Sequence, residues 1–212
     1  MLELLIKGGV LMIPIVIASI VSVTLIIERF IYWRKQKNSI SPIEMIRLVE
    51  AGKFDEFLKK GDANNGPVMR VLKAGIIYRV HQATLAMEAE AIKEMKEMNK
   101  HLPALDTIIT LAPLLGLLGT IIGMIQSFGV MSSTGLGHPL AVTGGISEAL
   151  IATAAGLIVA ITTLIPYNYF LSKAEKTTED IERYATRLEM VLIKAELEEQ
   201  ADSEGFITPA LN

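Results

Sequence analysis

Three long stretches of the chain carry no charged residue, and they limit its fold more than any other feature of the sequence. Residues 8–27 form an uncharged stretch of 20, residues 107–147 one of 41, and residues 149–172 one of 24. Because a helix rises about 1.5 Å per residue, roughly 20 apolar residues cross a hydrocarbon core about 30 Å thick. The first and third stretches each fit one crossing, and the second fits one crossing with a polar loop. The sequence therefore predicts an all-α integral membrane protein with three transmembrane helices.

The overall composition excludes several classes of protein. Hydrophobic residues make up 51% of the chain, which is close to the fraction in soluble domains, so their segregation is what indicates a membrane protein. A net charge of −3 gives no basic footprint for nucleic acid. The sequence has no cysteine, and His81, His101 and His138 show no metal-ligand spacing. No span offers a nucleophile together with a base, so we expect no enzyme activity, no metal and no cofactor.

The distribution of Lys and Arg predicts the orientation of the spans. Of the 20 basic residues, 13 lie in residues 34–106 and five follow Ser172, whereas residues 132–144 have none. Basic residues favour the cytoplasmic side, so we expect the N-terminus outside and the C-terminus in the cytoplasm. A cleaved signal peptide is the alternative for the first span, but its apolar run is longer than a signal core and its basic cluster follows the run.

Six segments follow from this orientation. They are an N-terminal segment with the first span (1–33), a cytoplasmic helical domain (34–106), the second span (107–131), an outer loop (132–144), the third span (145–171) and a cytoplasmic helix with a tail (172–212).

The cytoplasmic domain is predicted to be helical. Residues 41–44 (SPIE) are typical of a helix start, with an N-cap, a first-turn proline and an acid at N3. A second short helix is expected around residues 54–60, then a loop over 61–67, then a helical pattern from Val68. At residues 102–103 we expect a kink, because proline removes a backbone donor. The helices before the second span and after the third are thus expected to extend the spans into the cytoplasm.

Small residues line one face of the second span and one face of the third. At helical spacing they are Gly116, Gly119, Thr120 and Gly123 in the second span, and Thr153, Gly156 and Ala160 in the third. Small residues at this spacing let helix backbones approach closely in lipid. A packing role alone explains these residue types, and the alternative is that part of each face lines a polar lumen.

Glu148 is the one charged residue within residues 107–172. A carboxylate inside a membrane costs about 3 kcal/mol or more unless it is protonated, hydrated or paired. Either Glu148 faces the interior of a bundle and carries a proton there, or it is interfacial and the third span begins at Leu150. Glu148 and Thr153 lie about 140° apart around a helix, so we expect one to face a lumen and the other a neighbouring helix. Asn168 is a candidate for a polar vestibule or for a hydrogen bond between helices.

Two motifs in these spans resemble those of the ExbB/TolQ/MotA proton-channel family. They are LAPLLGLLGTIIGM at residues 111–124 and GGISEALIATAAGL at residues 144–157, together with Glu28-Arg29 and Tyr167-Asn168 at the ends of the first and third spans. The resemblance covers nearly the whole chain, including the order and orientation of its spans. The ExbB branch is the closer one, and the four-span arrangement of MotA does not fit.

The resemblance implies a multi-pass protein of the bacterial inner membrane, with a periplasmic N-terminus, that forms a homopentamer around a central lumen. The lumen would enclose the single-span helices of an ExbD-like dimer, whose Asp is the main proton carrier. Thr120 and Thr153 match the family's lumen threonines, and Glu148 matches its lumen glutamate. The motor would energise a TonB-like protein for active transport across the outer membrane. A TolQ-like role in a Tol-Pal envelope-maintenance motor and a purely structural membrane scaffold are the alternatives.

Overall fold

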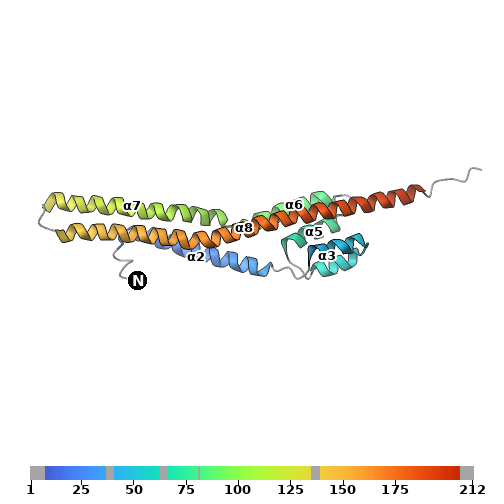
Figure 1. Cartoon of the computed structure of the whole chain (residues 1–212), viewed down its shortest axis with the longest axis horizontal. Helices are drawn as coiled ribbons and strands as arrows, with labels where there is room; N and C mark the ends of the chain where they lie inside the picture. The colour runs from blue at the N-terminus through green and yellow to red at the C-terminus, as the bar shows by residue number, and fades with distance from the viewer. Residues whose placement is uncertain (1–7, 37–40, 63–65, 81, 135–138, 206–212) are drawn as a thin grey trace, which may run out of the picture. The chain divides into compact units, whose positions relative to one another are not determined.

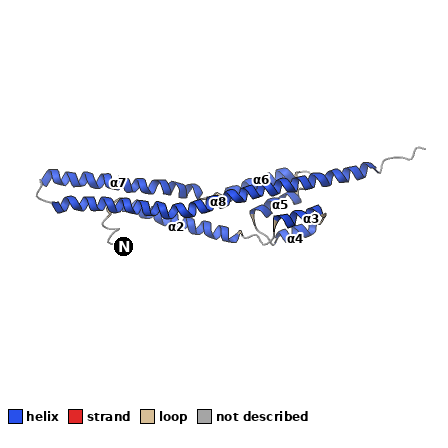
Figure 2. Cartoon of the chain, in the orientation of Figure 1, coloured by secondary structure: helices blue, strands red, loops and turns tan. Residues whose placement is uncertain are grey.

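The computed structural model describes residues 8–36, 41–62, 66–80, 82–134 and 139–205, and within these ranges it contains helices and no strand. The helices are α2 (Met12–Lys35), α3 (Pro42–Glu50), α4 (Phe54–Asp62), α5 (Pro67–Ile77), α6 (Ala83–Met98), α7 (Leu102–Thr134) and α8 (Pro139–Gly205) (Figures 1 and 2). Three stretches are long and apolar enough to cross a membrane, namely Met12–Lys35, Ala83–Ser132 and Thr143–Glu198. The chain is therefore an all-helical protein with three candidate membrane spans, as predicted.

The chain divides into two compact units. Unit 1 consists of Met1–Phe30 and His101–Leu171, and unit 2 consists of Ile31–Lys100 and Ser172–Asn212. The helices α2 and α8 contribute residues to both units, whereas α7 belongs to unit 1 and α3 to α6 belong to unit 2.

Unit 1 is built on the antiparallel pair of α7 and α8, with the first part of α2 packed against it (Figure 1). Its core cluster consists of Met12, Ile15, Ile108, Ala112 and Val159. Many large apolar side chains point outward instead, and Ile17, Ile125 and Ile165 are 57%, 65% and 70% exposed. Apolar surface of this extent marks a membrane or partner interface, because in water it would be unfavourable. The fold of unit 1 thus agrees with its sequence pattern.

Unit 2 buries an apolar core between shorter helices. Its members include Met45, Ile46, Phe57, Val68, Met69, Val71, Leu72, Ile76, Met87, Met98, Ile181 and Leu188. A glycine permits one close approach, because a methyl group at Gly75 of α5 would lie 2.6 Å from Met87 Sδ and 3.3 Å from Leu188 Cδ2. Through these contacts α5 packs against both α6 and the last part of α8.

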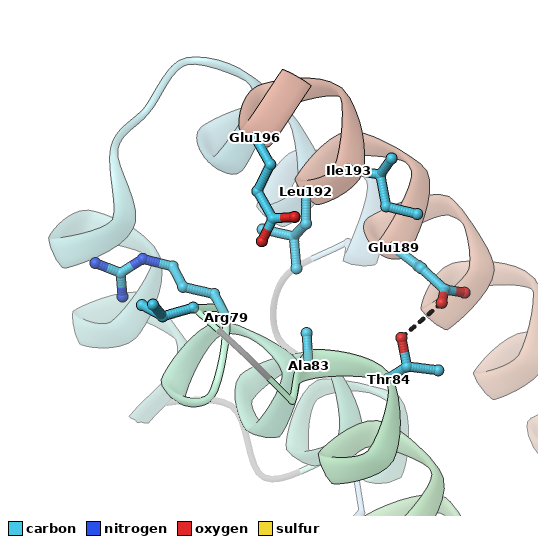
Figure 3. A pocket seen from close by; sticks show the side chains of 8 residues that line it. Arg79, Ala83, Thr84, Glu189, Leu192, Ile193 and Glu196 are labelled. Carbon is cyan, nitrogen blue, oxygen red and sulfur yellow. Dashed lines mark hydrogen bonds between the residues drawn. The ribbon is translucent and has the colours of Figure 1, made fainter. Parts of the chain in front are cut away.

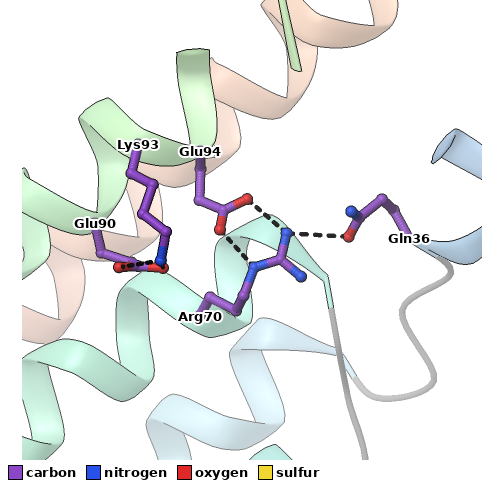
Figure 4. Close-up of polar contacts among 5 residues, drawn as sticks. All are labelled: Gln36, Arg70, Glu90, Lys93 and Glu94. Carbon is purple, nitrogen blue, oxygen red and sulfur yellow. Dashed lines mark hydrogen bonds and ion pairs between the residues drawn. The ribbon is translucent and has the colours of Figure 1, made fainter. Parts of the chain in front are cut away.

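An ion pair with a buried carboxylate joins α5 to α6 within unit 2 (Figure 4). Arg70 donates from Nε to Glu94 Oε1 and from Nη2 to Glu94 Oε2, each at 2.5 Å, and Nη2 also donates to Gln36 Oε1 at 3.2 Å. The Glu94 side chain is 4% exposed, whereas that of Arg70 is 32% exposed. Because Glu94 accepts these bonds, the pKa of Arg70 is raised above its ordinary value. Arg70 thereby compensates a carboxylate that burial alone would destabilise.

The connection into α7 differs from the predicted kink at residues 102–103. The helix α6 ends at Met98, and His101 has a φ of 66°, a left-handed conformation, directly before α7 begins. A right-handed helix cannot continue through a residue with this φ, so two separate helices form. Pro103 then lies in the first turn of α7. Backbone N–H groups in the first turn have no helical acceptor, so the N–H that proline lacks costs no hydrogen bond. The expectation of one kinked helix is wrong, whereas the helix after the third span does run on unbroken in α8.

The connection between α7 and α8 is shorter than the loop predicted over residues 132–144. The helix α7 extends to Thr134, and α8 already begins at Pro139, so residues 139–144 are helical. Proline is well suited to this first position, because its φ is preset and the N–H it lacks would have no helical partner. His138 and His81 lie outside the described residues.

The helix starts in unit 2 follow the sequence more closely. The helix α3 begins at Pro42 after Ser41, as predicted, although the Ser41 side chain makes no capping hydrogen bond. The helix α4 continues through Asp62, one residue beyond Gly61, where the loop was expected to have begun. The break between α5 and α6 is not evident in the sequence, because both helices share one apolar pattern that faces the same core.

We predict that Glu94→Gln lowers the free energy of unfolding by about 2 kcal/mol, because Arg70 loses a charged acceptor at a site with little water. The loss is smaller than for a fully buried pair, since Arg70 can still reach solvent. Thermal unfolding of the detergent-solubilised chain, followed by circular dichroism, measures the change.

The matched control for this variant is Glu198→Gln. Glu198 pairs with Lys194 at 3.6 Å on an exposed part of α8, so its loss should cost within about 0.5 kcal/mol. Equal shifts in the two variants would contradict the role given to the Arg70–Glu94 pair.

Candidate functional site

Glycines of α7 bring its backbone unusually close to α8. A methyl group at Gly116 would lie 2.9 Å from Thr153 Cα and 3.0 Å from Ala152 O, and one at Gly119 would lie 2.7 Å from Ala152 Cβ. These distances are shorter than real Cβ contacts allow. Gly116 and Gly119 therefore occupy positions where the two helices leave no room for a side chain.

The close approach continues toward the connection between α7 and α8. A methyl group at Gly123 would lie 2.8 Å from both Ala149 Cβ and Gly145 O, and one at Gly145 would overlap the hydroxyl of Ser127. That hydroxyl donates to Gly123 O at 2.9 Å. Small residues on both helices thus mesh over several turns, as close packing in lipid requires.

At the other end of this interface the glycine belongs to α8. A methyl group at Gly156 would overlap the carbonyl oxygen of Ala112 and lie 3.3 Å from Gly116 Cα. Ala160, one turn further along α8, is also buried. The packing residues inferred from the sequence therefore lie on the inner faces of unit 1.

The two threonines use their hydroxyl protons in different ways. Thr153 Oγ1 donates across the interface to Gly116 O at 2.9 Å, and Thr120 Oγ1 donates within α7 to Leu117 O at 2.6 Å. A carbonyl oxygen can only accept, so in both bonds the threonine must be the donor. Each hydroxyl oxygen still has lone pairs with which it can accept a further hydrogen bond.

Glu148 lies against the N-terminal turn. Its side chain is half-buried, and its carboxylate and Cγ fill the space that a methyl group at Gly9 would need. Among the residues that the structure describes, the Glu148 carboxylate has no hydrogen bond or ion pair. Thr153 thus contacts α7, whereas Glu148 contacts the N-terminal turn, and the expectation that one of the two faces a lumen stays a prediction.

Two polar residues near the other end of unit 1 differ in exposure. Asn168 is exposed on α8. Arg29 is almost completely buried, and its Nε and Nη2 donate to Glu28 Oε2 and Oε1 at 2.6 and 2.7 Å. Sequence reasoning noted Glu28 and Arg29 only as part of a pattern and did not anticipate the burial, which depends on neighbouring helices.

Gly9 was also missed. Its signal in the sequence is the Gly8-Gly9 pair directly before an apolar run, which is typical of a backbone turn.

A hollow on unit 2 is lined by other residues (Figure 3). It has a volume of about 290 Å³ and is lined by Arg79, Val80, Ala83, Thr84, Glu189, Leu192, Ile193 and Glu196. Thr84 Oγ1 donates to Glu189 Oε1 at 2.6 Å across it. Neither Glu148 nor the two threonines of unit 1 take part in it.

We predict that Gly156→Ala lowers the stability of the detergent-solubilised protein by about 1 kcal/mol or more, because the added methyl group meets the backbone of α7. The better helix propensity of alanine offsets only part of this strain. Gly144→Ala is the matched control, since nothing lies within 4 Å of a methyl group at that position of α8. Equal melting temperatures for the two variants would contradict the close contact.

Comparison with known proteins agrees with the features of unit 1. Residues 63–183 match the MotA/TolQ/ExbB proton channel family. An ExbB-like biopolymer transport protein of Synechocystis is 34% identical over 194 residues, which cover 87% of this chain and 91% of that protein. An ExbB homolog of Methanothermobacter thermautotrophicus is 33% identical over 188 residues, covering 85% of this chain and 66% of its own length.

A second branch of the family is also represented. The Tol-Pal system protein TolQ of Pseudomonas aeruginosa is 27% identical over 198 residues, covering 85% of each chain. The family match spans more than half of the chain, and the relative from Synechocystis spans most of it. With its three apolar helices and its glycine-rich α7–α8 interface, this chain belongs to the MotA/TolQ/ExbB proton channel family of membrane proteins.

Proposed function

We propose that this protein is the ExbB-like subunit of a bacterial inner-membrane motor driven by the proton-motive force. With an ExbD-like single-span partner, it would energise a TonB-like protein for active transport across the outer membrane. The observation that carries the proposal is Glu148, the one charge within residues 107–172, whose carboxylate has no partner among the described residues. An ionisable residue inside a membrane segment is by default functional, because it is costly to keep there.

The hydroxyl geometry supports a role in handling protonated carboxyl groups. Thr120 and Thr153 have committed their protons to main-chain carbonyls, so each can offer only an acceptor to an incoming group. A protonated carboxylic acid can donate to such an acceptor, and an ionised carboxylate cannot. We therefore infer that the two threonines favour the neutral form of the partner's Asp as it passes through the lumen.

The energy available for this step is sufficient. Moving one elementary charge across the membrane is worth about 2.3 kcal/mol per 100 mV. That energy is comparable with the cost of rearranging one or two buried hydrogen bonds. It can therefore bias a conformational step, provided that protons do not leak through the lumen.

Assembly as a homopentamer with a periplasmic N-terminus and a cytoplasmic C-terminus completes the proposal. Exposed apolar side chains on α7 and α8, such as Leu114 and Ile158, need lipid or a neighbouring copy to cover them. The basic residues at 34–106 and after Ser172 support the orientation. In this orientation unit 2 lies in the cytoplasm, and Asn168 lies at the inner end of the lumen, where it is a candidate for a polar vestibule.

A Tol-Pal envelope-maintenance motor is the second candidate. It is supported by the TolQ relative, which aligns with 85% of this chain. The two systems would use the same spans and the same proton-handling residues, so they differ in their partners rather than in unit 1.

We predict that Thr153→Val lowers energised transport at least about tenfold while the assembled complex is still recovered. The hydroxyl oxygen that accepts a hydrogen bond from the partner's protonated Asp is lost, whereas one interhelix hydrogen bond in a membrane contributes only about 0.6 kcal/mol to stability. Proton-motive-force-dependent uptake in cells that lack their own copy of the gene provides the measurement.

Two variants control for this result. Thr153→Ser keeps the hydroxyl and should retain most of the activity. Thr162→Val removes an exposed hydroxyl that donates only to carbonyls of its own helix, and it should leave transport unchanged. Full activity of Thr153→Val would favour the structural-scaffold alternative.

We also predict the composition of the intact complex. Co-expression with an ExbD-like single-span protein should yield five copies of this 23.1 kDa chain with two copies of the partner. Native mass spectrometry of the detergent-solubilised complex measures both numbers, and copurification of a TonB-like or a Tol-like protein separates the two candidate systems. A single copy without a partner would contradict the motor.

A further inference from the structure

The residues directly before α2 lie over the α7–α8 pair at the level of Glu148. A methyl group at Gly8 would lie 3.2 Å from Ile151 Cγ2 on α8, and one at Gly119 of α7 would lie 3.8 Å from Leu11 Cδ1. The turn itself is held by a bond from the N–H of Met12 to Gly9 O, at 3.1 Å. The start of α2 is therefore packed onto both helices of unit 1.

Gly9 contacts the whole end of the Glu148 side chain. A Cβ at Gly9 would overlap Oε1 and lie 2.7 Å from Cδ and 3.2 Å from Cγ. Carbon atoms in favourable contact are about 3.5–4.0 Å apart, so the carboxyl carbon of Glu148 would have to move by roughly 1 Å. The carboxylate thus packs directly against the Cα of Gly9, which carries no side chain.

We propose that Gly9 is a positioning residue for Glu148, and that the missing side chain at Gly9 determines where the carboxylate stands at the outer end of the α7–α8 pair. The proposal rests on the function proposed for Glu148 and extends it to a second segment of the chain. It gives the N-terminal turn a part in proton handling, because a displacement of Gly9 would also displace the carboxylate that it contacts.

The backbone conformation of Gly9 also opposes a side chain, independently of the contact with Glu148. Its φ of +72° lies in the left-handed region, where any side chain is strained. The chain offers a control for this strain at Gly52, which has a φ of +71° and nothing within 4 Å of an added Cβ. Gly52→Ala therefore shares the backbone strain of Gly9→Ala and lacks the collision with Glu148.

The experiment measures the reactivity of Glu148 directly. The full complex in membranes is treated with a water-soluble carbodiimide and glycine ethyl ester, and the modified Glu148 peptide is quantified by mass spectrometry over time. We expect Gly9→Ala to raise the labelling rate about threefold or more, because the added methyl group displaces the carboxylate from its packed position against Gly9. Gly52→Ala should label at the wild-type rate. An unchanged or slower rate in Gly9→Ala would overturn the proposal.

A double variant covers the case in which Gly9→Ala does not accumulate. Glu148→Ala removes the atoms that collide with the added methyl group, so Gly9→Ala combined with Glu148→Ala should accumulate as well as Glu148→Ala alone. Failure of the double variant to accumulate, with Glu148→Ala intact, would also overturn the proposal.

Transport measured in the same cells separates the positioning role of Gly9 from the function proposed for Glu148. If Gly9→Ala raises labelling and leaves transport normal, Gly9 does position Glu148 and the function proposed for Glu148 is the part that fails. Labelling itself does not depend on transport, so each idea has its own readout.

Discussion

The close approach of the α7 and α8 backbones is the constraint on which the rest of unit 1 depends. Gly116, Gly123 and Gly156 each stand where a methyl group would meet the backbone of the other helix. In lipid, burying apolar side chains between helices gains little free energy, because the lipid tails are equally apolar. Close contact between two helices therefore depends on the complementary shapes of their surfaces. The hydrogen bond from Thr153 to Gly116 O exists only because the helices are this close.

This packing also decides the chemistry that the interface can offer. With their protons committed to carbonyls, Thr120 and Thr153 present only acceptors, and a single carboxylate, Glu148, lies on the α8 face next to the N-terminal turn. Among the described residues, the Glu148 carboxylate makes no hydrogen bond or ion pair. In the function proposed for this chain, it would act as a scaffold around a partner that brings its own ionisable group. Arg29, near the end of the first candidate span, is buried and is paired with Glu28, which offsets the cost of burying its charge.

Unit 2 is stabilised by different forces. Its core is apolar in the manner of domains that fold in water, and the exception is the Arg70–Glu94 pair, whose short charged bonds offset the burial of a carboxylate. Here the sequence was informative about where helices begin, because the preset φ of Pro42 acts locally at the start of α3. It was less informative about how they end. His101 takes a left-handed φ that its residue type permits and does not require, so the break before α7 depends on packing.

The sequence by itself determined the three candidate spans, the helical fold and the small-residue faces, and it identified Glu148 as the one charge within residues 107–172. Each of these follows from the spacing of residues along one helix or from the cost of a charge in lipid. Only the tertiary structure decided that Thr153 bonds to α7, that Glu148 rests on Gly9, and that Arg29 is buried. These three features depend on which residues meet across helices that are far apart in the sequence, and no periodicity within one helix specifies its neighbour.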